Sequence, residues 1–177
     1  MYGAPLKTGF IIRFKVSENS AEKNGSSKSE DPSVLLDRKK QVDVIMKKHG
    51  AKILKQSSST PYAFRYEFTY KSDDLEALAK DIETVQNTEI LSIGKGLELI
   101  KDLGDATKVA DQYGLNKFMG THGIGHTRMA TESDVDIKSA HPYWAFPYQD
   151  VAVVHNGQLT NYWGNRRILE RNGYRFN

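Results

Sequence analysis

An Asn-Gly pair, Asn156-Gly157, stands directly after the apolar run Val151–Val154. Both residues tolerate positive φ, so between two apolar runs such a pair forms a tight hairpin turn. An amide side chain next to a backbone N–H that no Cβ obstructs can also hold an oxyanion at the end of a strand. Residues 158–162 do not begin an alternating partner strand, so the hairpin interpretation lacks its second arm.

Arg128 lies within another strand-like stretch, Ile124–Met129, with the sequence IGHTRM. A guanidinium group can donate two parallel hydrogen bonds to one carboxylate, which suits it to binding the α-carboxylate of an amino acid. An arginine at this place can equally form an ordinary surface ion pair. The residue types alone leave both interpretations open.

Four histidines, His122, His126, His141 and His155, fall in the same part of the chain. Their spacing matches no compact metal-ligand pattern, and no carboxylate accompanies them. We therefore predict no metal site, and interpret these histidines as core residues that hold loops.

The elements that must position these residues can be read from the hydrophobic pattern. Ile124–Met129 and Val151–Val154 are predicted as neighbouring strands of one sheet, with a loop carrying His141-Pro142 between them. Tyr162–Asn172 is predicted as a helix that ends near Gly173. Leu97–Tyr113 is a charged stretch with helical spacing.

The first half of the chain predicts a different arrangement. Strands are expected at Phe10–Val16, Ala51–Leu54, Tyr62–Tyr70 and Ile90–Ile93. Helices are expected from the N-cap candidate Ser33 to Gly50, and over Leu75–Val85 after the capping candidates Ser72 and Asp73. Residues 17–32 are polar and rich in turn formers, which favours a flexible loop. The resulting order, β-α-β-β-α-β, is typical of a ferredoxin-like split unit.

The composition limits the classes of function. With 25 Lys and Arg against 22 Asp and Glu, the net charge of +3 gives no basic block that would favour nucleic-acid binding. No apolar run is long enough for a membrane span, and residues 1–16 lack a signal-peptide layout, so we predict a cytoplasmic protein. The chain contains no cysteine, which excludes disulfides, thiolate metal sites and a cysteine nucleophile among these 177 residues.

Taken in order, the stretches THGIGHTRMATES, AHP, VAVVHNGQLTNY and RRILERNGYRF resemble the class II glutamine amidotransferases, whose glutaminase domain belongs to the N-terminal-nucleophile hydrolases. The closer resemblance is to the amidotransferase subunits of the split glutamate-synthase type, including that of methylamine-glutamate N-methyltransferase. In those proteins a segment similar to Ser92–Gly120 precedes the first of these motifs. The resemblance extends from about Gly9 to the last residue and is strongest after Ile93.

The resemblance implies an α+β fold, in which residues 95–177 form part of an N-terminal-nucleophile α-β-β-α sandwich. Residues 1–94 would then be a ferredoxin-like unit inserted into that amidotransferase domain. The compact first unit and the strands carrying Arg128 and Asn156 are therefore expected to be separable near Gly94.

The resemblance also implies a role for each motif residue. Arg128 would bind the α-carboxylate of glutamine, with Met129 and Thr131 lining the same pocket. The side chain of Asn156 and the backbone N–H of Gly157 would form the oxyanion hole. His126 and His155 would be structural supports.

The implied activity is hydrolysis of glutamine to glutamate and ammonia through a thioester, with ammonia passed to a synthase or transferase subunit in an oligomer. The flavin and iron-sulfur chemistry would belong to that partner, and no cofactor to this chain. The family attacks with a cysteine at its mature N-terminus, and places an acidic residue for the α-ammonium of the substrate after a segment like Gly173–Asn177. Neither is present here. We expect an internal fragment, inactive alone, of an active enzyme; the alternative is a nucleophile-free scaffold or glutamine-binding domain.

Overall fold

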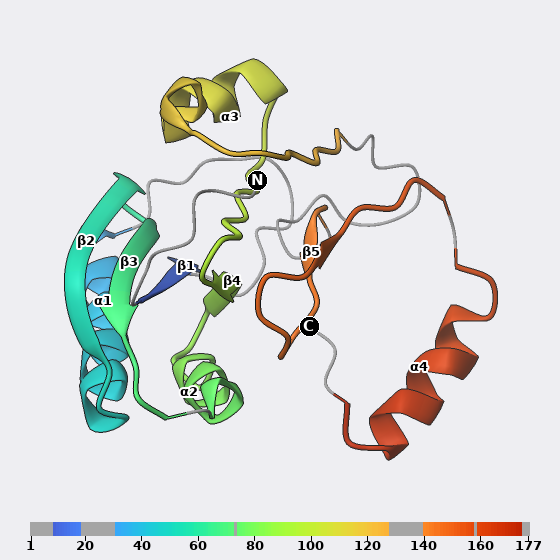
Figure 1. Cartoon of the computed structure of the whole chain (residues 1–177), viewed down its shortest axis with the longest axis horizontal. Coiled ribbons are helices and arrows are strands. Elements are labelled where there is room, and N and C mark those ends of the chain that lie inside the picture. The colour runs from blue at the N-terminus through green and yellow to red at the C-terminus, as the bar shows by residue number, and fades with distance from the viewer. Residues whose placement is uncertain (1–8, 19–30, 73, 128–139, 158, 175–177) are drawn as a thin grey trace.

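The computed structural model describes residues 9–18, 31–72, 74–127, 140–157 and 159–174 of the chain (Figure 1). Within these residues the elements are, in order, β1 (Phe10–Val16), α1 (Pro32–Lys48), β2 (Lys52–Thr60), β3 (Ala63–Thr69), α2 (Leu75–Ile82), β4 (Thr88–Gly94), α3 (Ala106–Tyr113), the short 3-10 helix η1 (Leu115–Lys117), β5 (Tyr143–Trp144), β6 (Ala152–Val153) and α4 (Tyr162–Arg171).

The first four strands form one antiparallel sheet in the order β2-β3-β1-β4, with α1 and α2 packed against it. This confirms the predicted element order β-α-β-β-α-β and gives the split β-α-β arrangement. Together with α3 and α4, the described chain is of the α+β class that was predicted. The specific four-layer sandwich implied by the resemblance stays a prediction.

The core of this unit reflects the alternation of side chains along β1. Ile12, Phe14 and Val16 are buried toward the two helices, whereas Arg13 and Lys15 turn to the opposite face. The helices and remaining strands complete the core with Leu35, Val42 and Met46 of α1, Leu78 and Ile82 of α2, Tyr66 and Phe68 of β3, and Ile90 and Ile93 of β4. Burying each large apolar side chain of this kind stabilises a fold by about 1.5–3 kcal/mol.

The start of α1 lies before the predicted N-cap. Asp31 is the cap, and its carboxylate accepts a hydrogen bond of 2.8 Å from the backbone N–H of Ser33. Pro32 occupies the first turn, where its missing N–H costs nothing and its fixed φ suits a helix. The prediction of Ser33 as the cap was therefore wrong. Gly50 lies just past the helix end with a φ of +76°, as the pattern predicted.

The cap of α2 is Asp74, which accepts a 2.8 Å hydrogen bond from the N–H of Ala77. Ser72, one of the two predicted caps, instead accepts a hydrogen bond from the N–H of Asp74. The other, Asp73, lies outside the described residues. Local polar residues therefore set the position of the helix start, although the cap itself is the next residue along the chain.

Strand β2 is much longer than the predicted strand Ala51–Leu54. It continues to Thr60, whose hydroxyl accepts a 2.9 Å hydrogen bond from the N–H of Ala63 in the turn to β3. Residues 55–59 are exposed on this edge strand, and residues 55–58 pair with β3 through their backbones. An edge strand with polar side chains has no hydrophobic alternation, so the pattern could not reveal its second half.

The second face of the sheet carries buried charges instead of an apolar core. Arg13 and Arg65 stand directly opposite each other on β1 and β3. Like charges in this position repel each other. Glu98 lies between them and accepts hydrogen bonds of 2.7 Å from both Nε atoms. Arg65 is paired with Glu67 as well.

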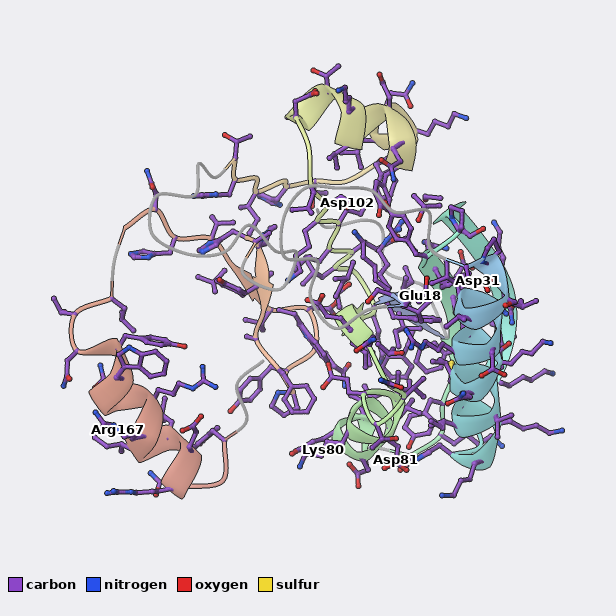
Figure 2. The ribbon with its side chains drawn as sticks, turned by 180° about the vertical axis from the view of Figure 1, so that it is seen from behind. Glu18, Asp31, Lys80, Asp81, Asp102 and Arg167 are labelled. Carbon is purple, nitrogen blue, oxygen red and sulfur yellow. The ribbon has the colours of Figure 1, made fainter. Side chains whose placement is uncertain are left out.

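A second cluster on the same face centres on Asp102, which Figure 2 labels below α3. Its Oδ2 atom lies 2.9 Å from the ammonium of Lys15 and accepts hydrogen bonds from the hydroxyls of Tyr113 and Tyr62, at 2.7 Å and 3.1 Å. Burial raises the pKa of Asp102, but the charge and hydrogen bonds around it outweigh burial and hold that pKa below its ordinary value. Burial and the bond to Asp102 both raise the pKa of Tyr113, so its hydroxyl stays a donor.

These two clusters explain why the prediction of a helix over Leu97–Tyr113 was wrong for the first half of that range. Only Ala106–Tyr113 is helical, beginning after the N-cap Asp105. The backbone N–H of Leu99 donates to the hydroxyl of Ser92, a residue of β4. Residues 97–102 therefore lie across the charged face of the sheet, where Glu98 and Asp102 form their ion pairs.

Replacing Tyr113 by Phe is expected to lower the free energy of unfolding by about 1–2 kcal/mol, because a buried hydroxyl that donates to a carboxylate is lost. Urea unfolding followed by circular dichroism measures the change. Tyr148→Phe is the matched control: this exposed tyrosine should change stability by less than about 0.5 kcal/mol. Equal stability of the Tyr113→Phe protein and the wild type would contradict the role given to Asp102.

Candidate functional site

The candidate site lies at the end of the small β5–β6 sheet. Its two strands are antiparallel, with Tyr143 opposite Val153 and Trp144 opposite Ala152. The connecting loop is closed by hydrogen bonds from the N–H of Ala145 to the carbonyl of Val151, and from the Trp144 indole to the carbonyl of Tyr148 at 2.7 Å. These contacts fix the position of β6, and therefore the start of the residues after it.

The predicted pairing of Ile124–Met129 with Val151–Val154 is corrected by this sheet. Residues 124–127 are not in a strand, and among the described strands β6 pairs only with β5. Arg128 and Met129 lie outside the described residues. The predicted loop at His141-Pro142 is confirmed; it leads directly into β5.

Asn156 and Gly157 come after β6 at an exposed strand end. Gly157 has a φ of +152°, and a Cβ there would lie 3.3 Å from Cε1 of His155, so the position favours glycine. No described residue hydrogen-bonds the Asn156 side chain or the Gly157 N–H. The pair therefore presents two neighbouring donors that no described residue engages.

The hairpin interpretation of Asn156-Gly157 is excluded because no second strand comes after the pair in the described chain. Residues 159–161 are not in a strand, and α4 begins at Tyr162. This helix ends at Arg171, one residue before the predicted end, and Gly173 lies beyond it with a φ of +87°. Figure 1 shows α4 standing apart from the sheets, and none of its residues is buried.

The histidines of the region meet around His141. Its Nδ1 atom accepts a 3.0 Å hydrogen bond from the backbone N–H of His155. Its ring stacks on that of His126, with ring centres 4.8 Å apart. The centre of the Tyr143 ring lies 4.4 Å from the centre of the His141 ring. His126 and His155, which were predicted as supports, are thus linked through His141. The prediction that these four histidines are core residues was wrong, because His122 and His155 are exposed and His126 and His141 are only half-buried. In the sequence, the AHP motif was the feature that pointed to His141.

Asp150 is a second residue that sequence reasoning missed. Its backbone has a φ of +57°, and its carboxylate accepts hydrogen bonds from the N–H groups of Lys95, Gly96 and Leu97. Because these three partners are more than 50 residues away in the chain, no local pattern indicates the contact.

The remaining predicted site residues, Arg128, Met129 and Thr131, lie outside the described part of the chain. Within the described part, no cluster of three or more His, Asp or Glu side chains is placed to hold a metal ion. In that same part, no helix combines the length and the apolar character that a membrane span requires.

Comparison with known proteins shows what the chain is related to. No family model matches it. A Methanothermobacter thermautotrophicus protein whose name classes it as a glutamine amidotransferase is 38% identical over 147 residues, which are 82% of this chain and 48% of that protein. The chain therefore spans about half of that relative.

Two further relatives match a smaller part. The glutamine amidotransferase-like protein GlxB of Rhizobium meliloti is 40% identical over 90 residues, 51% of this chain and 29% of GlxB. The isomerizing glutamine--fructose-6-phosphate aminotransferase of Thermus thermophilus is 35% identical over 82 residues, 46% of this chain and 13% of that enzyme. These relatives confirm the resemblance to glutamine amidotransferases that the motifs indicated, and the closer resemblance to the split glutamate-synthase type stays a prediction. The chain is a homologue of the class II glutamine amidotransferases and matches a part of their length.

Proposed function

We propose that this chain contributes the oxyanion hole and the carboxylate-binding pocket of a glutaminase site. In the full-length protein this site would hydrolyse glutamine to glutamate and ammonia, and ammonia would pass to a synthase or transferase partner. The observation that carries the proposal is the pair of donors at Asn156 and Gly157, which no residue in the described part of the chain engages, in a chain homologous to glutamine amidotransferases.

The proposed chemistry assigns each step to a group. A thiolate attacks the side-chain amide carbon of glutamine, and the carbonyl oxygen becomes an oxyanion held by the Asn156 amide and the Gly157 N–H. Collapse of this intermediate breaks the C–N bond, releases ammonia after protonation of the nitrogen, and leaves a thioester. Water then hydrolyses the thioester to glutamate. These steps need no cofactor in this chain.

The thiolate must come from outside these 177 residues, because they contain no cysteine. Since the chain spans about half of the amidotransferase with which it shares 147 aligned residues, the proposal places the nucleophile in the remainder of the protein. The absence of cysteine also favours a second candidate function, a domain that binds glutamine or serves as a scaffold without hydrolysing it.

Glutamate release from glutamine, measured with the full-length protein and with the 177-residue chain, separates the two functions. The proposed enzyme requires turnover by the full-length protein and none by the chain alone. Binding of glutamine by the chain in calorimetry, together with an inactive full-length protein, would establish the second function and contradict the first.

Replacing Arg128 by Ala in the full-length enzyme is expected to raise the KM for glutamine at least as much as it lowers kcat. A carboxylate-binding arginine is engaged both before and during the reaction, so its loss weakens substrate and transition state together. The matched control is Arg167→Ala on α4, whose guanidinium donates to the Trp163 carbonyl and is labelled in Figure 2. An unchanged KM in the Arg128→Ala enzyme would show that this arginine does not bind the substrate.

A further inference from the structure

The carboxylate of Asp150, two residues before β6, links this part of the chain to the end of β4 in the larger sheet. Oδ1 of Asp150 accepts hydrogen bonds from the backbone N–H groups of Gly96 and Leu97, at 2.9 Å and 2.8 Å. Oδ2 accepts a third from Lys95 at 3.1 Å. Three successive backbone N–H groups that converge on one anion form a concave nest, an arrangement typical of anion binding in proteins.

The backbone on both sides is shaped for this contact. Asp150 has a φ of +57°, a conformation that aspartate tolerates better than most residues. A Cβ on Gly94, the last residue of β4, would lie 2.0 Å from Oδ1 of Asp150. Only glycine at this position lets the carboxylate reach the nest.

The position of Asp150 in the chain connects the nest to the candidate site. Val151 is the next residue and accepts a hydrogen bond from the N–H of Ala145. At the other end of the same short segment, the N–H of His155 donates to Nδ1 of His141. Residues 150–155 are thus held at both ends, and the donors of Asn156 and Gly157 come immediately after.

We propose that Asp150 is a positioning residue for the oxyanion hole: by binding the nest at 95–97, it sets the place of Asn156 and Gly157 relative to the sheet that contains β4. This inference rests on the proposed glutaminase function. An oxyanion donor contributes to catalysis only when it is held within a few tenths of an ångström of the developing charge. Loosening Asp150 should therefore reduce kcat more than it raises KM.

Two variants separate the carboxylate from the backbone conformation. Asp150→Asn keeps the shape of the side chain and its tolerance of positive φ. It has one acceptor oxygen, whereas the three N–H groups of the nest donate to both oxygens of the aspartate. Asp150→Gly allows the same φ and removes every bond to the nest. Asp111→Asn, a change at an exposed residue of α3, is the control for loss of one carboxylate.

In the full-length enzyme we expect kcat for glutamine to fall by about tenfold in Asp150→Asn and by about 100-fold in Asp150→Gly, with KM changed less than threefold. Asp111→Asn should match the wild type. An active wild-type enzyme together with unchanged kcat in both Asp150 variants would overturn the inference, while leaving the proposed function in place. An inactive wild-type enzyme would count against the proposed function instead.

Nuclear magnetic resonance of the 177-residue chain tests positioning without turnover. Hydrogen exchange at the amides of Lys95, Gly96 and Leu97 should accelerate in Asp150→Asn, and the amide signals of Asn156 and Gly157 should shift with them. If amide exchange at residues 95–97 accelerates but the chemical shifts of the Asn156 and Gly157 amides stay unchanged, Asp150 fixes only the loop around itself. That result would refute the proposed coupling.

Discussion

Replacing Asn156 by Ala in the full-length enzyme is expected to lower kcat for glutamine hydrolysis by about 10²- to 10³-fold, with little change in KM. The side-chain amide meets a neutral carbonyl in the bound substrate and an oxyanion in the tetrahedral intermediate, so the bond strengthens as charge develops. The structure leaves this amide unengaged by any described residue, as such a role requires. Steady-state kinetics of glutamate release measure both constants.

Two further variants sharpen this result. Asn156→Asp keeps the size of the side chain but replaces the donor by a negatively charged acceptor, so its kcat should fall at least as far as that of Asn156→Ala. Asn165→Ala, on the exposed surface of α4, removes an asparagine away from β6 and should leave kcat unchanged. If Asn156→Ala retains the wild-type kcat, the assignment of this residue to the oxyanion hole is wrong.

Replacing Glu98 by Gln is expected to destabilise the fold by about 3–5 kcal/mol, because it leaves the buried guanidinium of Arg13 without a carboxylate, whereas half-buried Arg65 keeps Glu67. Arg13 and Arg65 oppose each other directly across β1 and β3, and Glu98 bridges them from outside the sheet. Burial lowers the pKa of Arg13, yet an arginine stays charged near neutral pH. The unpaired charge therefore cannot be relieved by deprotonation.

The control for this change is Glu76→Gln on α2. Glu76 pairs with Lys80 across one helical turn, and both side chains are more than 40% exposed. Solvent weakens such pairs, so the expected loss is below about 0.5 kcal/mol. Urea unfolding of both variants gives the comparison. A Glu98→Gln protein as stable as the Glu76→Gln protein would contradict a structural role for the buried bridge.

The same bridge predicts how stability depends on pH. Burial raises the pKa of Glu98, but the hydrogen bonds and charges of Arg65 and Arg13 outweigh it, so the pKa lies below the ordinary value of 4.5. A carboxyl with a depressed folded-state pKa stabilises the fold above 4.5, and this contribution is lost as the pH falls through the folded-state value. Glu98→Gln should flatten this part of the stability curve.

The elements of the N-terminal unit could be predicted from the sequence because their signals are local. Alternation over Tyr62–Tyr70 and the helical spacing from Leu75 reflect one buried face each, and they gave β3 and α2 nearly at their observed bounds. The helix after the candidate site was predicted to within one residue at its end. Asn156 and Gly157 could be named together because they are adjacent in the chain, so their joint chemistry needs no fold to bring them together.

Tertiary structure alone decided which partners the buried charges find. Glu98 reads as part of a charged helix, but its partners Arg13 and Arg65 are 85 and 33 residues away, and meeting them holds the chain around Glu98 out of a helix. Asp150 binds backbone N–H groups rather than side chains. Because almost every residue has a backbone N–H, the sequence does not indicate which of them will be bound. The spacing of apolar residues indicates which face of one local segment is buried. An ion pair or a nest forms only after segments that are distant in the sequence have packed together.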